Sequence, residues 1–396
     1  MNFIFVSLQR INTDRESTST SLAKELAKEH QVLYVNPPID RKAWLLPSED
    51  VFIQAHIKQI KEGKTGLVKD ENNLWVLTPG KIIESLNWIP STSVFSFFNK
   101  FNNKRFAGDI KKAIKQLNFN NFNLIIDKDI FRSYYLKELL KPKFTIYLDR
   151  DYTLGFDYWK RHGVTLEPKL MSKCDAVVCN SMDFTKKDMN YNLNSFYISN
   201  GANLNIFNAE KDWQEPAELV GLARPIVGYV GALTSTRLDI SLIENIAKNL
   251  NRGSLVLIGP EDDGFLNSEL HQIPNVHFIP KMKTEIVPSY LSYFDVCINP
   301  QLLNEITLGN FPLKIVEYLA MGKPIVGTAT NTMKEVFSNH SYLALTPAEF
   351  NKQIAKAIAE DNELLKAERI SFSKNFSWKK VTANLLQVIQ KLKETV

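Results

Sequence analysis

The stretch NFPLKIVEYLAMGKPIV, Asn310–Val326, contains a short helix pattern followed directly by a strand pattern. Ile315 and Leu319 are one helical turn apart, and together with Met321 they are expected to face a core. The helix is expected to end at Gly322, and the apolar run after it begins a strand. A helix that leads directly into a buried strand is the repeating unit of a parallel sheet covered by helices.

The same alternation of strand and helix patterns runs through the whole chain. Strand-like runs occupy residues 3–8, 32–36, 124–127, 144–148, 176–179 and 196–198 in the first half, and 226–230, 255–259, 276–279, 296–299 and 325–328 in the second. A chain of 396 residues suits two domains better than one core. We therefore predict an α/β protein with two Rossmann-like, doubly wound domains facing across a cleft, where ligands bind beyond the carboxyl ends of the strands.

The predicted boundaries follow from where this alternation is interrupted. The N-terminal domain spans residues 1–207 and contains an insertion, 42–121, that is rich in Trp and Phe. Residues 208–224 have no clear strand pattern and are the expected linker. The C-terminal domain spans 225–376, and the helix pattern of 377–396 is expected to pack back on the N-terminal domain.

Composition excludes several classes of protein. Hydrophobic residues make up 44% and charged residues 23%, and no apolar run reaches the ~20 residues of a membrane span. The start of the chain lacks a signal-peptide pattern. The three cysteines are odd in number and form no C-x-x-C pair, so neither a disulfide framework nor a zinc site is expected. Both observations lead us to expect a cytoplasmic protein. The net charge of +5 does not indicate nucleic-acid binding, although residues 1–210 carry 29 Lys and Arg against 23 Asp and Glu.

Common nucleotide and hydrolase fingerprints are absent from the sequence. Gly228 and Gly231 have the wrong spacing for the G-x-G-x-x-G of dinucleotide-binding domains. No G-x-x-x-x-G-K-[ST] phosphate loop and no G-x-S-x-G elbow occurs. A dehydrogenase, a P-loop NTPase and an α/β-hydrolase therefore lose support.

Asn310–Val326 resembles the donor-site motif of glycosyltransferase family 4 and its GT-B relatives, in which E-x-F-G-x-x-x-x-E precedes A-x-G-x-P-V. The second Glu of that motif, which holds the nucleotide ribose, matches Glu317, whereas the first Glu falls at Gly309. Lys314 gives the stretch the P-x-K-x-x-E-Y-x-A-x-G-K-P form of teichuronic-acid and exopolysaccharide glycosyltransferases. Weaker similarity extends over most of the chain, as in 228–231, 257–260 and 376–378.

This resemblance implies a GT-B glycosyltransferase of the hexosyltransferase type that takes a sugar from a nucleotide-diphosphate sugar. The acceptor is expected to be a glycan or a lipid-linked saccharide in bacterial surface polysaccharide synthesis, with retention of configuration and without a metal or cofactor. Two alternatives stay open. One is an NDP-sugar epimerase of the same fold; the other is a non-catalytic nucleotide-sugar-binding assembly partner, which the missing first Glu leaves open.

A nucleotide diphosphate gains charge as its bond to the sugar breaks, so its site needs cations and backbone N–H groups. The loop 307–310 leads to the N-terminus of a helix, and Lys314 and Arg237 can add positive charge. The predicted donor-binding residues are Gly231, Arg237, Thr307, Gly309, Asn310, Lys314 and Glu317. The two cations are also catalytic candidates, with solvated surface charges as the alternative.

Asp149 and Asp151 follow the predicted strand 144–148, where an apolar run becomes charged. One interpretation is that either carboxylate contacts the acceptor or acts as a general base. The other is a structural ion pair or loop cap. A metal site on this D-x-D pair, as in GT-A enzymes, is the least favoured interpretation, because GT-B enzymes generally need no metal.

Four further residues are candidates for an acceptor or phosphate loop. Arg15, Ser17 and Thr18 lie in the first strand-to-helix loop, although helix capping explains Ser17 and Thr18 equally well. His162 is the histidine expected nearest the cleft, with a structural role as the alternative.

Aromatic and basic residues are interleaved in 95–115. This composition suits peripheral contact with an anionic membrane surface. The alternative is that the phenylalanines are core residues and the lysines a solvated helix face.

Overall fold

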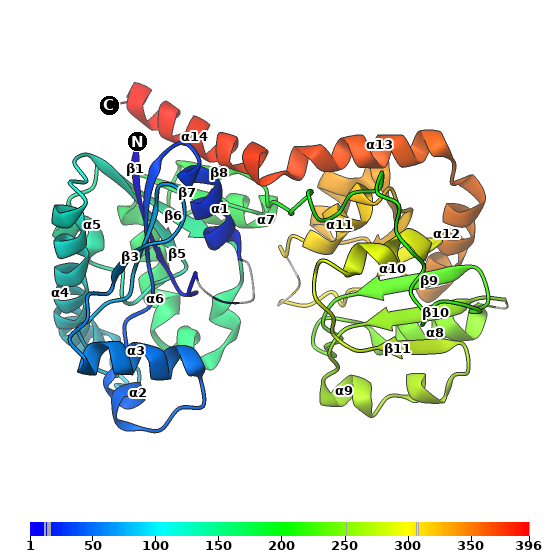
Figure 1. Ribbon diagram of the computed structural model, residues 1–396, viewed down its shortest axis with the longest axis horizontal. Helices are drawn as coiled ribbons and strands as arrows, with labels where there is room; N and C mark the ends of the chain where they lie inside the picture. The colour runs from blue at the N-terminus through cyan, green and yellow to red at the C-terminus, as the bar shows by residue number, and fades with distance from the viewer. Residues whose placement is uncertain (12, 14–16, 251, 306, 308, 396) are drawn as a thin grey trace. The chain divides into compact units, whose positions relative to one another are not determined.

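The computed structural model describes residues 1–11, 13, 17–250, 252–305, 307 and 309–395 (Figure 1). The chain forms two compact units. One contains Met1–Ser199 together with the residues from Val381 onward, and the other contains Asn200–Lys380. Each unit is built on one sheet of mainly parallel strands covered by helices, so the predicted α/β class with two doubly wound domains is confirmed.

The first unit has an eight-stranded sheet in the order β3-β4-β2-β1-β5-β6-β7-β8. Its strands are β1 Asn2–Ser7, β2 Gln31–Val35, β3 Leu67–Lys69, β4 Leu74–Leu77, β5 Phe122–Asp127, β6 Phe144–Asp149, β7 Ala176–Cys179 and β8 Ser195–Tyr197. All neighbouring strands are parallel except β3 and β4. The central strands are apolar runs buried on both faces, as in other parallel sheets covered by helices.

The helices of the first unit are α1 Thr18–Ala27, α2 Arg41–Leu45, α3 Val51–Lys61, α4 Thr92–Gln116, α5 Leu136–Leu140, α6 Asp157–Lys173 and α7 Met182–Asp188. The helix α14, Trp378–Thr395, contributes its residues from Val381 onward. Its Asn384 donates a hydrogen bond to the carbonyl oxygen of Ile198, 3.2 Å away.

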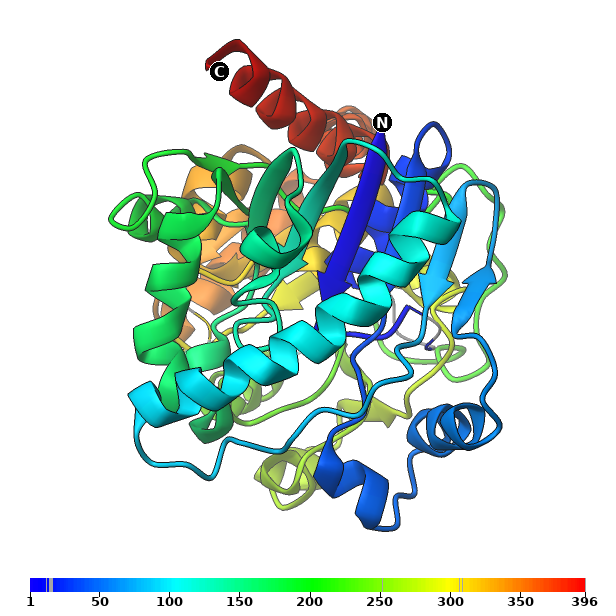
Figure 2. The same ribbon diagram turned by 90° about the vertical axis from the view of Figure 1, so that its left-hand side faces the viewer.

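The segment 42–121 was expected as an insertion, and the structure corrects this expectation. Its strand β4 pairs in parallel with β2 and therefore belongs to the sheet. Its helix α4 lies across one face of that sheet (Figure 2). The strand β4 has only four residues, too few to stand out as a period-two or apolar pattern in the sequence.

The second unit has a six-stranded parallel sheet in the order β11-β10-β9-β12-β13-β14. Its strands are β9 Ile226–Val230, β10 Ser254–Ile258, β11 Val276–Ile279, β12 Val296–Asn299, β13 Ile325–Thr328 and β14 Tyr342–Ala344. Its helices are α8 Ile240–Asn249, α9 Asp263–Leu266, α10 Val287–Tyr293, α11 Leu313–Ala320, α12 Pro347–Glu360 and α13 Glu363–Ser373. Short 3-10 or π-helical turns occupy 153–155, 269–272, 333–337, 338–340 and 374–376.

Residues 208–224, expected as a linker, pack on the second unit. Leu219 is buried in its core, and Trp213 packs against the same cluster. The hydroxyl of Tyr293 donates a hydrogen bond to the carbonyl oxygen of Trp213, 2.9 Å away. The segment lacks a strand pattern because it is an irregular covering of this unit.

Candidate functional site

The sheet of the second unit changes winding direction at β9, which pairs with β10 on one side and β12 on the other. Ligands of doubly wound sheets bind at such a point, beyond the carboxyl ends of the strands. Gly231 follows β9 and Gly259 follows β10, and their φ angles of 148° and 147° favour glycine. A Cβ on Gly259 would collide with the carbonyl oxygen of Gly231, so glycine allows the two loops to meet.

The loop after β12 is held against the turn after β9. Asn304 Nδ2 donates to the carbonyl oxygen of Thr236 at 2.9 Å, and the Leu302 N–H donates to that of Arg237 at 2.9 Å. The Arg237 side chain is exposed and forms no hydrogen bond or ion pair with the part of the chain that the structure describes. Its backbone therefore fixes the loop, while its guanidinium group faces solvent.

Thr307, Gly309 and Asn310 shape the approach to α11. The buried Thr307 hydroxyl donates to the carbonyl oxygen of Leu302, and its N–H donates to Asn304 Oδ1 at 3.1 Å. Gly309 has a φ of 76°, and the Asn310 N–H donates to the carbonyl oxygen of Thr307 at 3.1 Å. The Thr307 side chain is thus used to hold the loop.

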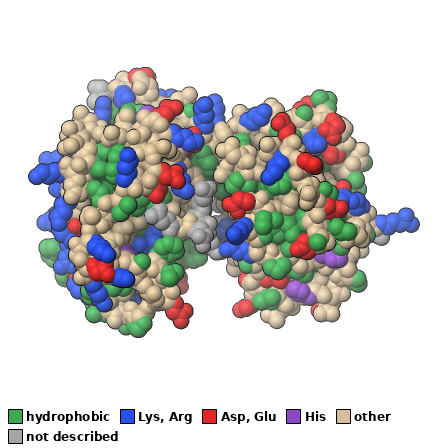
Figure 3. All heavy atoms as spheres, viewed as in Figure 1, with side chains coloured by type: hydrophobic (Ala, Val, Ile, Leu, Met, Phe, Trp, Pro, Cys, Tyr) green, Lys and Arg blue, Asp and Glu red, His purple; other side chains and the backbone are tan. Residues whose placement is uncertain are grey.

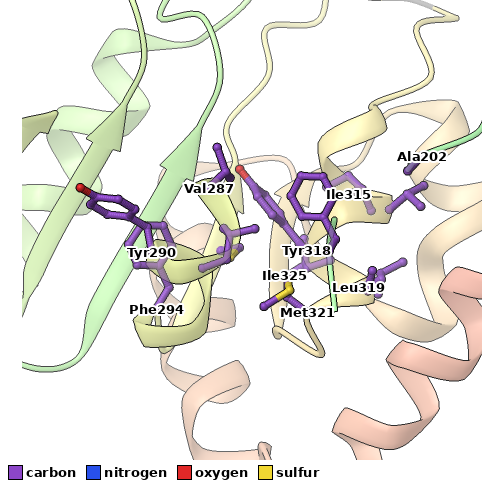
Figure 4. Close-up of a cluster of buried hydrophobic side chains, with 14 of the residues drawn as sticks. Ala202, Val287, Tyr290, Phe294, Ile315, Tyr318, Leu319, Met321 and Ile325 are labelled. Carbon is purple, nitrogen blue, oxygen red and sulfur yellow. The ribbon is translucent and has the colours of Figure 1, made fainter. Parts of the chain in front are cut away.

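Helix α11 is fixed against β9 by its apolar face (Figure 4). Ile315, Tyr318 and Leu319 are fully buried, and the Tyr318 hydroxyl accepts a hydrogen bond from the Val230 N–H at 2.9 Å. Pro312 precedes the helix without a side-chain cap. The first N–H groups of α11 thus lack a capping side chain, and such N–H groups bind anions.

Lys314 and Glu317 lie one turn apart on α11. Lys314 Nζ donates a hydrogen bond to the hydroxyl of Tyr229 and lies 3.9 Å from the centre of its ring. The same Nζ would be 2.9 Å from a Cβ at Gly231, so the cation lies directly beside the glycine turn. Tyr229 was not predicted as a site residue, because within its strand it looks like one more core aromatic.

Glu317 is half-buried, and its carboxylate forms no hydrogen bond or ion pair with any side chain in the described ranges. Burial raises the pKa of Glu317 to about 7, and the charge of Lys314 opposes this shift. A carboxylate in such surroundings is costly unless a ligand donates hydrogen bonds to it. The site therefore combines a hydrogen-bond acceptor with a cation and free helix N–H groups.

Asp149, at the end of β6, is fully buried between two lysines. Lys128 Nζ lies 2.6 Å and Lys187 Nζ 3.1 Å from its carboxylate oxygens, and Lys128 also pairs with Glu167 at 2.7 Å. Burial opposes ionisation, but the charges of Lys128 and Lys187 outweigh it and hold the pKa of Asp149 below its ordinary value. Asp149 fits the structural ion pair and not an acceptor contact, because no solvent reaches it.

Asp151 has a different environment, with 48% of its side chain exposed. Arg150 Nη1 lies 2.6 Å from its carboxylate, while Arg150 Nε donates to the buried Asp127 at 2.6 Å. Arg150 therefore links Asp151 to the core of the sheet at the carboxyl end of β6. Of the two aspartates, Asp151 is the one that a substrate can reach.

The remaining candidates of the first unit are mostly structural. Ser17 caps α1, since its hydroxyl accepts from the Thr20 N–H at 3.3 Å, and Thr18 is buried in the first turn. His162 is fully buried, stacked on Phe95 with ring centres 4.1 Å apart, and burial lowers its pKa. Capping and packing thus account for these side chains, and Arg15 lies outside the described residues.

The described ranges contain neither a cluster suited to a metal ion nor a helix suited to a membrane span. These residues contain no group of three or more His, Cys, Asp or Glu side chains placed to hold a metal ion. None of their helices has both the length and the apolar character needed to cross a bilayer.

Residues 224–360, which form most of the second unit, match the family model of glycosyl transferases group 1. The chain is also similar to the putative teichuronic acid biosynthesis glycosyltransferase TuaH of Bacillus subtilis (strain 168), with 25% identity over 225 residues. The match covers 54% of this chain and 56% of TuaH, so the chain spans about half the length of this curated relative.

Solved structures with the same fold are similar over nearly the whole chain. They include sucrose-phosphate synthase of Thermosynechococcus elongatus, at 15% identity and a TM-score of 0.66, with 100% and 99% of the two chains covered. The α,α-trehalose-phosphate synthase of Burkholderia vietnamiensis is 11% identical, with a TM-score of 0.70 and coverage of 100% of this chain and 99% of that one. Anabaena HepE, solved with UDP, is 13% identical, with a TM-score of 0.65 and coverage of 98% of this chain and 99% of that one. These similarities confirm the predicted GT-B fold.

Proposed function

We propose that this protein is a glycosyltransferase that moves a sugar from a nucleotide-diphosphate sugar to a glycan or lipid-linked acceptor in bacterial surface polysaccharide synthesis. The observation that carries the proposal is the carboxylate of Glu317, which has no hydrogen-bond or ion-pair partner among the described residues and lies beside Lys314 near the uncapped start of α11, within the stretch that matches group 1 glycosyl transferases. Two similarities support it. TuaH is named for teichuronic acid biosynthesis, and HepE has been solved with UDP and with UDP-glucose.

In the proposed reaction the ribose hydroxyls of the donor donate hydrogen bonds to Glu317. The diphosphate lies against the Gly231 turn, the first N–H groups of α11 and Lys314, and the exposed Arg237 folds onto it. As the bond between sugar and phosphate breaks, negative charge grows on the diphosphate and these groups stabilise it. The acceptor oxygen forms the new bond to the sugar carbon with retention of configuration, and its proton passes to a carboxylate on the acceptor side, a role that we assign to Asp151.

Replacement of Glu317 by Ala tests the donor site. We expect the affinity for the nucleotide sugar and for the free nucleoside diphosphate to fall alike, by about 10- to 100-fold, or roughly 1.5–3 kcal/mol, because ribose contacts persist after the sugar leaves. A thermal-shift screen of UDP-, GDP- and ADP-glucose selects the ligand, and calorimetry measures its dissociation constant. Glu335→Ala, a change of carboxylate elsewhere in the second unit, is the matched control.

The same experiment has a pH arm. Since the pKa of Glu317 is about 7 in the free protein, affinity for UDP-glucose should weaken as the pH falls from 8 to 6, and Glu317→Gln should remove this dependence. A folded Glu317→Ala protein that binds nucleotide as tightly as the wild type would sink the assignment.

The two rival functions give different results with the same material. An epimerase converts free NDP-sugar without an acceptor, whereas a transferase leaves it intact apart from slow hydrolysis. A non-catalytic binding partner, the alternative that Gly309 keeps open, binds the nucleotide sugar and yields no product with any acceptor.

We further propose that the reaction needs no metal ion, because helix N–H groups and Lys314 supply the charge opposite the diphosphate. Activity should then remain within about twofold of its untreated value after EDTA treatment and gel filtration. Complete inhibition that Mn²⁺ or Mg²⁺ reverses would contradict this proposal and favour a metal site at Asp149 and Asp151.

Helix α4 supports peripheral contact with an anionic membrane. Phe95 and Phe106 are buried, as the core alternative requires, but Phe97 and Phe101 are 61% and 52% exposed. Lys104 lies over the Phe101 ring at 5.9 Å, and Figure 3 shows Lys and Arg side chains along the side of the first unit where Figure 1 labels α4. Exposed aromatics beside lysines suit the headgroup region of a bilayer.

The test is sedimentation with vesicles of phosphatidylglycerol and phosphatidylcholine. Replacement of both Phe97 and Phe101 by Ser should reduce the bound fraction at least threefold, since each aromatic loses its apolar contact. Leu193→Ser, at a side chain 87% exposed elsewhere in this unit, controls for lost surface hydrophobicity. Equal binding of both variants and the wild type would contradict membrane contact through α4.

A further inference from the structure

The first unit contains a cavity of about 350 Å³ that none of the roles assigned above uses. Arg10 follows β1, Arg132 follows β5, and Tyr158 and Trp159 belong to the first turn of α6, so the cavity lies at the carboxyl edge of the sheet. Its volume falls within the roughly 300–1,000 Å³ of small-molecule sites. Cavities at this edge are where doubly wound sheets bind ligands.

Two guanidinium groups face this cavity. Arg10 has no carboxylate within ion-pair distance among the described residues, and its Nη1 lies 3.4 Å from Nδ1 of His56. Burial and the nearby charge of Arg132 lower the pKa of Arg10, while the charge of Asp50 opposes this. Burial lowers the pKa of His56 to about 4, so this ring is neutral and adds no charge at neutral pH.

Arg132 is oriented by the fully buried Asp129, which contacts its Nε at 2.9 Å. Its two Nη groups form no hydrogen bond with the residues that the structure describes, and its side chain is 19% exposed. Two guanidinium groups that repel each other at one cavity are stabilised by an anion placed between them, and a guanidinium fork suits a carboxylate or phosphate.

The carboxylates at the cavity are already engaged. Glu84 binds Arg41 at 2.8 Å and Arg105 at 2.7 Å, and these contacts lower its pKa to about 2. Asp40 caps α2, accepting from the Ala43 N–H at 2.8 Å. Neither carboxylate lies within ion-pair distance of Arg10 or Arg132, so among the described residues Arg10 and the Nη groups of Arg132 keep positive charge for a ligand.

An aromatic wall lies beside the two arginines. The rings of Phe131 and Trp159 are stacked, with centres 5.2 Å apart, and Tyr158 packs edge-on against Trp159 at 4.9 Å. Phe131 is buried, whereas Tyr158 is exposed and Trp159 is partly exposed. Flat aromatic faces with a polar edge suit the apolar face of a sugar ring whose hydroxyls point elsewhere.

We infer that this cavity binds an anionic sugar of the acceptor, with the carboxylate or phosphate group held by Arg10 and Arg132 and the ring against Trp159 and Tyr158. The inference rests on the proposed glycosyltransferase function and specifies its acceptor by chemical class. A neutral sugar fits the aromatic wall alone and gives Arg10 and the two Nη groups of Arg132 no anionic partner, so the site discriminates by charge.

Three probes of similar size test this inference: methyl glucuronide, glucose 1-phosphate and methyl glucoside. With UDP present to occupy the donor site, calorimetry on the full chain should show at least tenfold tighter binding of one or both anionic probes. Binding of the uronide alone identifies a carboxylate-bearing sugar, binding of the phosphate alone a phosphorylated one, and both results support the site.

Arg10→Gln and Arg132→Gln should each reduce this preference for the anionic probe to threefold or less, and Arg10→Lys should retain part of it. Lys112→Gln, an equal loss of charge on the exposed side of α4, should leave it unchanged. Because Arg132 also pairs with buried Asp129, Arg10→Gln is the decisive variant if Arg132→Gln unfolds.

Equal binding of all three probes by the wild type, or a preference that survives Arg10→Gln, would overturn the inference. Unchanged UDP-glucose affinity in these variants separates this result from the donor site. If UDP-glucose fails to bind the wild type while the anionic preference depends on Arg10, the proposed function fails and the anion site remains.

Discussion

Replacement of Lys314 by Met is expected to lower the turnover number by about 100-fold or more and to raise the Michaelis constant of the donor much less. Lys314 lies beside the Gly231 turn and its Nζ contacts the Tyr229 hydroxyl, so it is held where the departing diphosphate is proposed to lie. The charge of that group increases in the transition state, and a cation there stabilises the transition state more than the bound donor.

The comparison needs saturating acceptor and a pH above 8, because loss of Lys314 removes a charge that lowers the pKa of Glu317. Arg237→Met should show the same pattern, and Arg237→Lys should also be impaired if the planar fork is needed. Lys283→Met, an exposed cation of the same unit, is the control and should keep wild-type turnover. If Lys314→Met and Arg237→Met both keep it as well, the phosphate assignment is wrong.

Replacement of Lys128 by Met is expected to destabilise the first unit by about 3–5 kcal/mol, because it leaves Asp149 and Glu167 buried without their shared cation. Lys187 still pairs with Asp149, so Glu167 carries most of the loss. Urea unfolding of the full chain at pH 7.5 measures the effect. Lys28→Met, which breaks an exposed pair with Glu25, should cost less than 1 kcal/mol.

The effect of this substitution depends on pH in a defined direction. The pKa of Asp149 is lowered in the folded protein, so its ion pairs add stability above the ordinary Asp pKa of about 4, and this stability is lost as the pH falls. The difference between wild type and Lys128→Met should therefore be largest near neutral pH and shrink below pH 5. A constant difference from pH 7.5 down to pH 3.5 would show that the buried charges do not cause it.

The sequence determined the features that depend on short stretches of chain. The helix and strand of 310–326 were predicted from the spacing of Ile315 and Leu319 and from the apolar run after Gly322, because the buried face of a short helix depends on neighbouring residues in the sequence. Repeated units of this kind predicted two doubly wound sheets, and the resemblance of 310–326 to a glycosyltransferase donor motif predicted the GT-B fold. Glu317 and Lys314 were also found locally, since both belong to one turn of α11.

Only the tertiary structure decided which charged residues meet. Asp149 and Asp151 look alike in the sequence, but Lys128 and Lys187 enclose the first, while Arg150 holds the second at the surface. The pairing of β4 with β2 likewise depends on contacts between distant segments. Arg10 and Arg132 come together because β1 and β5 are neighbours in the sheet. The two residues are far apart in the sequence, so no local pattern predicts that their charges repel each other. Local periodicity predicts the class of fold, because it depends on neighbouring residues, whereas burial and ion pairing depend on residues far apart in the chain.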